Sequence, residues 1–201
     1  TPDEVAHAAC RELLAARTAA RRPEGSSARP PEAAAAAAPS REMADDAFAA
    51  VERGDEARLR QLLEGGVHPD TADELGRTLA YLAADNGKEG CLRLLLERGA
   101  DPNTVDEGLG WPLAFKLVYQ GHAACLRLIL EHRADPDRTD RGGWTPLFAA
   151  AVNGKEPCLR ALLEHRADPE VGHGETPLRA ATHGGHTACA ELLAAHIAAR
   201  R

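Results

Sequence analysis

Downstream of residue 40, apolar residues occur in short blocks separated by glycines and by Asp-Pro or His-Pro dipeptides. Within a block such as Cys91-Leu-Arg-Leu-Leu-Leu96, apolar side chains recur at spacings of three and four, which places them on one face of an α-helix. Glycine supplies the conformational freedom that a tight turn between two helices needs. The pattern therefore predicts a short helix, a glycine-centred turn, a second helix and a loop that leads to the next unit.

This unit is repeated along the chain. Four segments align on a glycine that is followed four residues later by a cysteine: Gly87-Lys-Glu-Gly-Cys91-Leu-Arg-Leu-Leu-Leu96, Gly121-His-Ala-Ala-Cys125-Leu-Arg-Leu-Ile-Leu130, Gly154-Lys-Glu-Pro-Cys158-Leu-Arg-Ala-Leu-Leu163 and Gly185-His-Thr-Ala-Cys189-Ala-Glu-Leu-Leu193. The cysteines lie 34, 33 and 31 residues apart, and a weaker copy begins at Gly54. The sequence therefore contains an internal repeat with a period near 33 residues.

Helix-start signals precede three of the copies, at Thr78, Thr145 and Thr176, and a proline follows the last two threonines. A threonine oxygen at such a position accepts from N–H groups of the first helical turn, and a proline after it has no N–H to lose. A period near 33 with a Thr-Pro-Leu start and a Gly-Ala-Asp-Pro exit resembles the ankyrin repeat. The resemblance covers about residues 41–201.

The resemblance implies an all-α ankyrin-repeat solenoid of about five helix–turn–helix repeats with an N-terminal helical extension. We expect the repeats at about 41–77, 78–111, 112–144, 145–175 and 176–201. One such unit cannot bury its apolar face alone, whereas stacked neighbours form a continuous core. The last copy never reaches a Gly-Ala-Asp-Pro exit, which predicts a terminal cap.

The copies depart from the family pattern at three kinds of position. The histidine of the family's Thr-Pro-Leu-His motif is replaced in every copy, by Phe48, Tyr81, Phe115, Phe148 and Arg179. Aromatic packing is therefore expected where the family uses histidine hydrogen bonds. The third copy starts with Trp111-Pro112 and is expected to lack a side-chain cap. Arg133 and Arg166 stand where a glycine normally takes the left-handed conformation, and a side chain there costs roughly 1 kcal/mol.

The first forty residues differ from the repeats. Residues 1–22 are predicted to form a helix that starts at Thr1-Pro2-Asp3-Glu4 and carries Val5, Ala9, Leu13, Ala16 and Ala20 along one face. Residues 23–40 are a Pro/Ala/Ser-rich linker by composition. The helix is either a tethered or self-capping segment or one that docks in a partner's groove. A chain that begins at Thr1 fits either a processed protein or a fragment.

Composition narrows the classes of function. The formal net charge of -7 offers no surplus of Lys and Arg to neutralise phosphates, so we expect no nucleic-acid partner. The chain is 44% hydrophobic but only 3% aromatic, so Leu, Ala and Val must fill the core. No stretch approaches the ~20 consecutive apolar residues of a membrane span, and no apolar core of a secretory signal precedes the repeats.

The cysteines and histidines invite a metal or disulfide hypothesis, which the repeat argues against. Equivalent positions in adjacent repeats lie about 10 Å apart. That spacing exceeds the ~7 Å between Cα atoms that a disulfide allows, and it does not gather four ligands around one zinc ion. We therefore expect buried structural cysteines, a reducing compartment, no metal and no cofactor. No nucleophile–histidine set or phosphate-binding glycine loop is discernible, so we expect no enzyme.

The resemblance also implies a binding surface, because ankyrin-repeat proteins bind partners through a concave face formed by loop tips and by the first helix of each repeat. Carrying those positions over residue by residue gives ten candidate partner-binding residues: Arg77, Asp85, Asn86, Trp111, Tyr119, Gln120, Trp144, Val152, Asn153 and His183. Trp111, Tyr119 and Trp144 come from the third and fourth repeats and belong to the types that most often dominate interface energetics. We predict an anchor patch there.

The sequence thus predicts a non-enzymatic protein–protein interaction module, a recognition or scaffold protein with a protein partner. The alternative is a fixed structural subunit of a larger complex, docked partly through its N-terminal helix and linker. We expect an intracellular reducing compartment, with the cytoplasm first and an organelle as the alternative. Partner identity and oligomeric state stay open, because one fold hosts many unrelated partners.

Overall fold

The computed structural model describes residues 41–106, 110–171 and 174–200. The predicted N-terminal helix and linker therefore lie outside the described residues. The described part contains ten helices: α2 (Arg41–Arg53), α3 (Glu56–Glu64), α4 (Leu79–Asp85), α5 (Glu89–Glu97), α6 (Leu113–Gln120), α7 (Ala123–Glu131), α8 (Pro146–Val152), α9 (Glu156–Glu164), α10 (Pro177–His183) and α11 (Thr187–Ala199).

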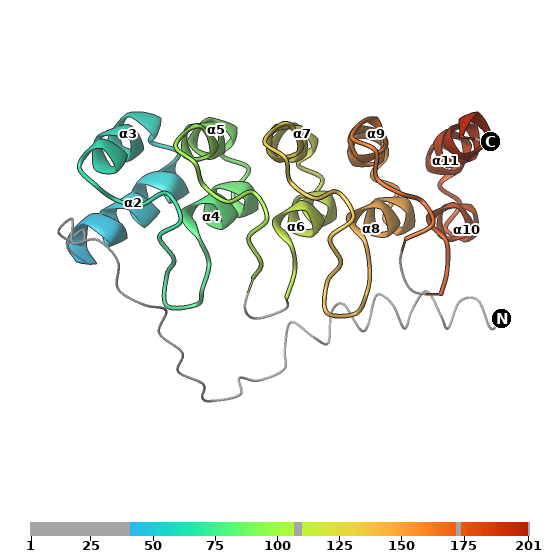
Figure 1. The fold of residues 1–201 in the computed structure, drawn as a ribbon, viewed down its shortest axis with the longest axis horizontal. Coiled ribbons are helices and arrows are strands. Elements are labelled where there is room, and N and C mark those ends of the chain that lie inside the picture. Colours follow the sequence, from blue (N-terminus) through green and yellow to red (C-terminus); the bar gives the residue numbers. More distant parts are fainter. Residues whose placement is uncertain (1–40, 107–109, 172–173, 201) are drawn as a thin grey trace.

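The helices stack in two rows (Figure 1). One row, here called the inner row, holds α2, α4, α6, α8 and α10, and the outer row holds α3, α5, α7, α9 and α11. Each inner helix packs against its outer partner and against the next inner helix, and the outer helices pack in the same order. The predicted all-α repeat solenoid is therefore confirmed. One helix pair falls inside each expected range, while the exact repeat boundaries stay predictions.

The threonine caps fix where three inner helices begin. Thr78 Oγ1 accepts from Tyr81 N at 3.1 Å, and Thr145 Oγ1 accepts from Phe148 N at 3.2 Å. Thr176 caps α10 in the same way. Helix α6 instead begins after Pro112, which makes no side-chain cap bond. The caps predicted from sequence, and the missing one, are thus confirmed.

Leucines at equivalent positions form the core between the two rows. Leu59, Leu92, Leu126 and Leu159 occupy one position of the outer helices, Leu79 and Leu113 occupy one position of the inner helices, and all six are fully buried. Burying one leucine side chain stabilises the fold by about 1.5–3 kcal/mol relative to leaving it exposed. These leucines belong to a single cluster of buried residues that runs from Ala47 to Leu193, so the core is continuous along the stack.

Aromatic side chains occupy the position of the family histidine. Tyr81, Phe115 and Phe148 are buried, and Phe48 is partly buried against the core, whereas Arg179 is exposed at the last repeat. Burial raises the pKa of the Tyr81 hydroxyl. The expected apolar substitution is therefore confirmed in four repeats.

Two helix exits adopt the predicted strained backbone. Arg133 and Arg166 have φ of 67° and 66°, in the left-handed region, and they are the positive-φ non-glycine residues of the described part. The equivalent Gly66 and Gly99 have φ of 102° and 88°. The turn therefore requires a positive φ at this position, whether the residue is glycine or arginine.

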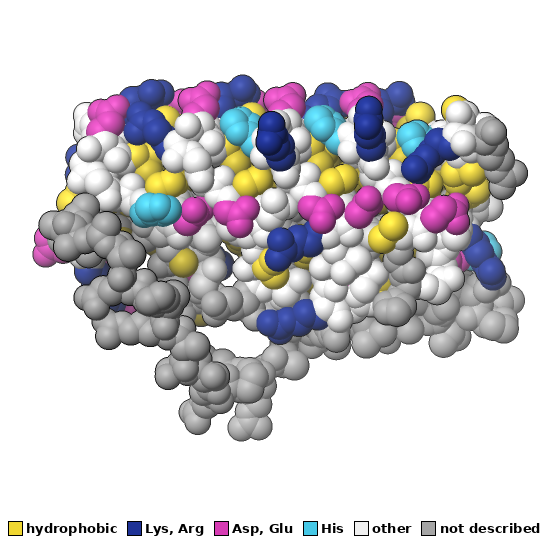
Figure 2. All heavy atoms as spheres, viewed as in Figure 1, with side chains coloured by type: hydrophobic (Ala, Val, Ile, Leu, Met, Phe, Trp, Pro, Cys, Tyr) yellow, Lys and Arg dark blue, Asp and Glu magenta, His cyan; other side chains and the backbone are white. Residues whose placement is uncertain are grey.

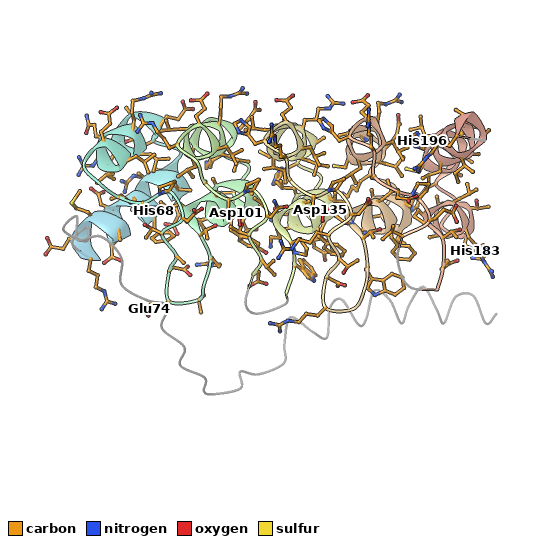
Figure 3. All side chains as sticks on the ribbon, in the orientation of Figure 1. His68, Glu74, Asp101, Asp135, His183 and His196 are labelled. Atoms are coloured by element: carbon orange, nitrogen blue, oxygen red, sulfur yellow. The ribbon has the colours of Figure 1, made fainter. Side chains whose placement is uncertain are left out.

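A ladder of side-chain to backbone bonds joins the turns that follow the outer helices. Asp70, Asn103 and Asp137 each accept, through Oδ1, the backbone N–H of Asp101, Asp135 or Asp168 in the next repeat, at 2.8–2.9 Å. These turns form an acidic row across one face of the molecule (Figure 2; Asp101 and Asp135 are labelled in Figure 3). The ladder was not anticipated from the sequence.

Candidate functional site

The ten predicted partner-binding residues lie at the C-terminal ends of inner helices or in the loops before those helices. The loops project from the stack on the side of the inner row (Figure 1). We call the exposed side chains of the inner helices and of these loops the inner-row surface. The ten residues are spread along it from the α3–α4 loop to α10 rather than gathered in one cluster.

An aromatic group lies at the third repeat. The Trp111 ring centroid is 5.3 Å from that of Phe115 and 5.1 Å from that of Tyr119. Tyr119 is 42% exposed, whereas Trp111 is 6% exposed. The structure therefore places Trp111 beneath Tyr119, where it supports the exposed ring. Direct contact of Trp111 with a partner stays a prediction.

A polar group joins the second and third repeats beside these rings. Lys116 Nζ lies 2.9 Å from Asp85 Oδ1 and 5.9 Å from the centroid of the Trp111 ring. The Gln120 amide nitrogen donates to both the backbone carbonyl and the carboxylate of Asp85. Asp85 and Gln120, both predicted as contact residues, are thus bonded to each other. They hold α4 and α6 in register, and sequence spacing gave no signal for this pairing.

The fourth repeat presents a second tryptophan. The Trp144 ring stacks on Phe148 with centroids 4.3 Å apart and an interplanar angle of 27°. The ring is half-buried, and its backbone N–H donates to Asp140 Oδ1 at 2.9 Å. Asp140 is itself 8% exposed, so the loop around Trp144 is held by a buried carboxylate. Part of the Trp144 ring is therefore at the surface, and its contacts with Phe148 and Asp140 hold it in place.

The other candidates close helix ends or form local ion pairs. Asn86 and Asn153 donate their side-chain amides to carbonyls four residues earlier, at 3.0 and 2.8 Å. Val152 is half-buried, and its carbonyl lies 2.9 Å from a ring nitrogen of His186. His183 lies 3.1 Å from Glu175 at the far end of the stack (Figure 3).

Arg77 belongs to a charged loop before α4. Its guanidinium pairs with Asp73 at 2.7 Å, and Asp73 Oδ1 also accepts from the backbone N–H groups of Leu75 and Arg77. Burial acts to raise the pKa of the Asp73 carboxyl, but the hydrogen bonds and the charge of Arg77 outweigh it and lower that pKa. The loop tip is thus held by an ionised carboxylate.

The four described cysteines are buried and free, which confirms the predicted burial. Burial raises the pKa of the Cys91 and Cys158 thiols to about 11, and it raises that of Cys125 and Cys189 as well. Within the described ranges, no three His, Cys, Asp or Glu side chains are grouped as metal ligands. In the same residues no helix has the length and apolar character to cross a membrane.

Stacked helix pairs with protruding loops define the class of helical-repeat solenoids. The family model for ankyrin repeats (3 copies) matches residues 47–106 and 113–200, so the chain belongs to the ankyrin-repeat family. Ankyrin repeats are generally protein–protein interaction modules, and proteins built from them are typically non-enzymatic. The comparison with curated proteins gave no match.

Proposed function

We propose that this chain is a non-enzymatic recognition module that binds a protein partner through its inner-row surface, with Tyr119 as an anchor. The side chains that carry this proposal are the exposed large hydrophobics of the described residues, namely Leu75, Tyr119 and Val171. Tyr119 is on an inner helix, and Leu75 and Val171 are in the loops between repeats. The outer helices contribute none. Exposed large hydrophobics that occur on an inner helix and in the loops between repeats, but not on the outer helices, fit one binding face.

Tyr119 has the properties of an interface anchor. Its ring is 42% exposed and rests on the buried Trp111. Because this contact already restricts the ring, a partner that binds it loses little free energy to the ordering of the side chain. Tyrosine is among the residue types that most often contribute 2 kcal/mol or more to binding. The bonds of Lys116 and Gln120 to Asp85 hold the base of this anchor in place.

Affinity capture with mass spectrometry tests the proposal. The intact chain is compared with Tyr119→Ala and with Arg127→Ala, an exposed residue of the outer helix in the same pair. We expect Tyr119→Ala to weaken partner binding about 30-fold, the equivalent of roughly 2 kcal/mol, and Arg127→Ala to leave it unchanged. Both variants should keep the helical circular dichroism of the parent.

Equal capture by all three chains would remove Tyr119 from the binding surface. A stoichiometric complex that resists high salt in all three would instead favour the alternative function, a fixed subunit of a larger assembly. The four buried, free cysteines support the proposed reducing compartment.

A further inference from the structure

One position of the inner-row surface changes in character along the stack. The residue two places before each turn glycine is Glu52, Asp85, Tyr119, Val152 and His183, from the first repeat to the fifth. Glu52, Tyr119 and His183 are exposed, and Asp85 and Val152 are half-buried. The series therefore runs from acidic, through aromatic and aliphatic, to histidine. Arg179 is exposed beside the last member, and the Glu175 carboxylate lies 3.1 Å from His183 and 3.6 Å from Arg179.

Part of the negative charge of α2 is unpaired, although Arg53 and Arg58 neutralise Asp46. Glu42, Asp45 and Glu52 are exposed on α2 and form no ion pair with any residue of the described ranges. Asp85 shares its carboxylate with Lys116. An occupant of this surface that carries positive charge over α2 and an apolar stripe over Tyr119 would be complementary to it.

Residues 1–22 run in the same order along the chain, from acidic through apolar to basic, so they are complementary to the surface when placed antiparallel to it. Arg17, Arg21 and Arg22 stand at its C-terminal end, the apolar stripe from Val5 to Ala20 lies along the predicted helix, and Asp3 and Glu4 stand at the start. The basic end is the one nearest the linker, and the linker joins α2 at Arg41. Antiparallel placement therefore brings basic residues to the acids of α2 and Asp3 and Glu4 toward His183.

The lengths agree with this placement. A helix of 22 residues is about 33 Å long. Repeat positions about 10 Å apart place Tyr119 about 20 Å, and His183 about 40 Å, from Glu52, so a helix that begins over α2 covers Tyr119 and ends near the fourth repeat, before His183. The linker, residues 23–40, spans about 23 Å on average as a flexible chain and about 56 Å when fully extended. Tethering at this range gives an effective concentration in the millimolar range, so even weak contacts would hold the segment.

We propose that residues 1–22 bind in cis along the inner-row surface, with Arg17–Arg22 over α2 and the apolar stripe over Tyr119. An external partner must then displace them. The proposal rests on the proposed function, because it assigns a regulator to the same surface. The occupant is a segment of this chain, and its chemistry is that of an amphipathic helix with a basic C-terminal end.

A spin label on Cys10 tests the placement in the full chain. The four described cysteines are buried with raised thiol pKa values, so a thiol reagent under native conditions is directed to Cys10, which peptide mapping confirms. The nuclear magnetic resonance signals of backbone amides near the label are broadened relative to the reduced, diamagnetic label. We expect strong broadening at the loop before α6 and along α6, and none on the outer face of α9.

Two variants of the segment make the test specific. Leu13→Glu places a charge in the apolar stripe, whereas Thr18→Glu places the same charge on the opposite side of the predicted helix. We expect Leu13→Glu to lose the broadening and Thr18→Glu to retain it. Broadening that is uniform, that is confined to the amides near Arg41, or that is equal in both variants would overturn cis binding. Partner capture by Tyr119→Ala is a separate measurement, so failure of one proposal is distinguishable from failure of the other.

Discussion

Replacing Arg133 and Arg166 with glycine should stabilise the stack. Both residues hold φ near 66° at helix exits where the first two repeats use glycine. The left-handed conformation costs a residue with a Cβ about 1–2 kcal/mol. Glycine loses about 0.5–1 kcal/mol more conformational entropy than alanine on folding, which offsets part of the gain. The net stabilisation is therefore about 0.5–1 kcal/mol per site.

The two sites lie in adjacent repeats, about 10 Å apart, and should be nearly additive. Neither arginine side chain forms a hydrogen bond or ion pair with the described residues, so little is lost when the side chains are removed. The free energy of unfolding of the double variant should be about 1–2 kcal/mol higher than that of the parent. For a domain of this size that raises Tm by about 3–6 °C.

Thermal and urea unfolding followed by circular dichroism at 222 nm measure the change. Arg138→Gly is the matched control, because Arg138 is an exposed arginine outside the positive-φ set. It should be destabilised by about 0.5–1 kcal/mol through the entropy of glycine alone. Backbone strain at these exits is the wrong explanation if the double variant has a lower free energy of unfolding than the parent, as the control should. The left-handed backbone at Arg133 and Arg166 would then cost less than the entropy that glycine adds.

Three further perturbations follow from the structure. Thr145→Ala should lower the free energy of unfolding by about 1 kcal/mol, measured by urea titration, because the helix loses its cap, while exposed Thr139→Ala should not. In native protein at pH 8, Ellman's reagent should react quickly with Cys10 alone, and the four described cysteines should react only once urea unfolds the chain; fast reaction of more than one thiol per native chain would contradict their burial. Asp73→Asn should destabilise by about 1 kcal/mol at pH 7. Because the folded pKa of Asp73 is lowered, its contribution is present above the unfolded pKa near 3.8 and disappears as pH falls through the folded value, so the difference between parent and variant should shrink as pH falls below 3.8.

The features predicted from sequence and then found in the structure depend on neighbours along the chain. Thr78 and Thr145 cap helices that begin at the next residue, and Arg133 takes a conformation set by its own helix exit. The period of about 33 residues was enough to place the cysteines and leucines in the core. These features rest on interactions within one helical turn or on one recurring face.

The features missed from sequence join residues more than thirty positions apart. Asp70 holds the turn at Asp101, and Gln120 bonds to Asp85 across two repeats. A signal for the first was present, since an Asp or Asn follows each Pro in the first three exits. The second had no such signal, because nothing comparable recurs in the other repeats.

The pattern of residues along the chain was enough to predict the all-α repeat, the order of the helices, the caps and the side of each helix that is buried. Only the tertiary structure decided that Trp111 lies beneath Tyr119, so that the tyrosine forms the exposed part of the predicted anchor patch. Helix geometry is set by bonds four residues apart and can be deduced from a local pattern. Exposure depends instead on how neighbouring helices and loops are offset when they stack, and that offset is fixed by contacts between residues distant in the chain.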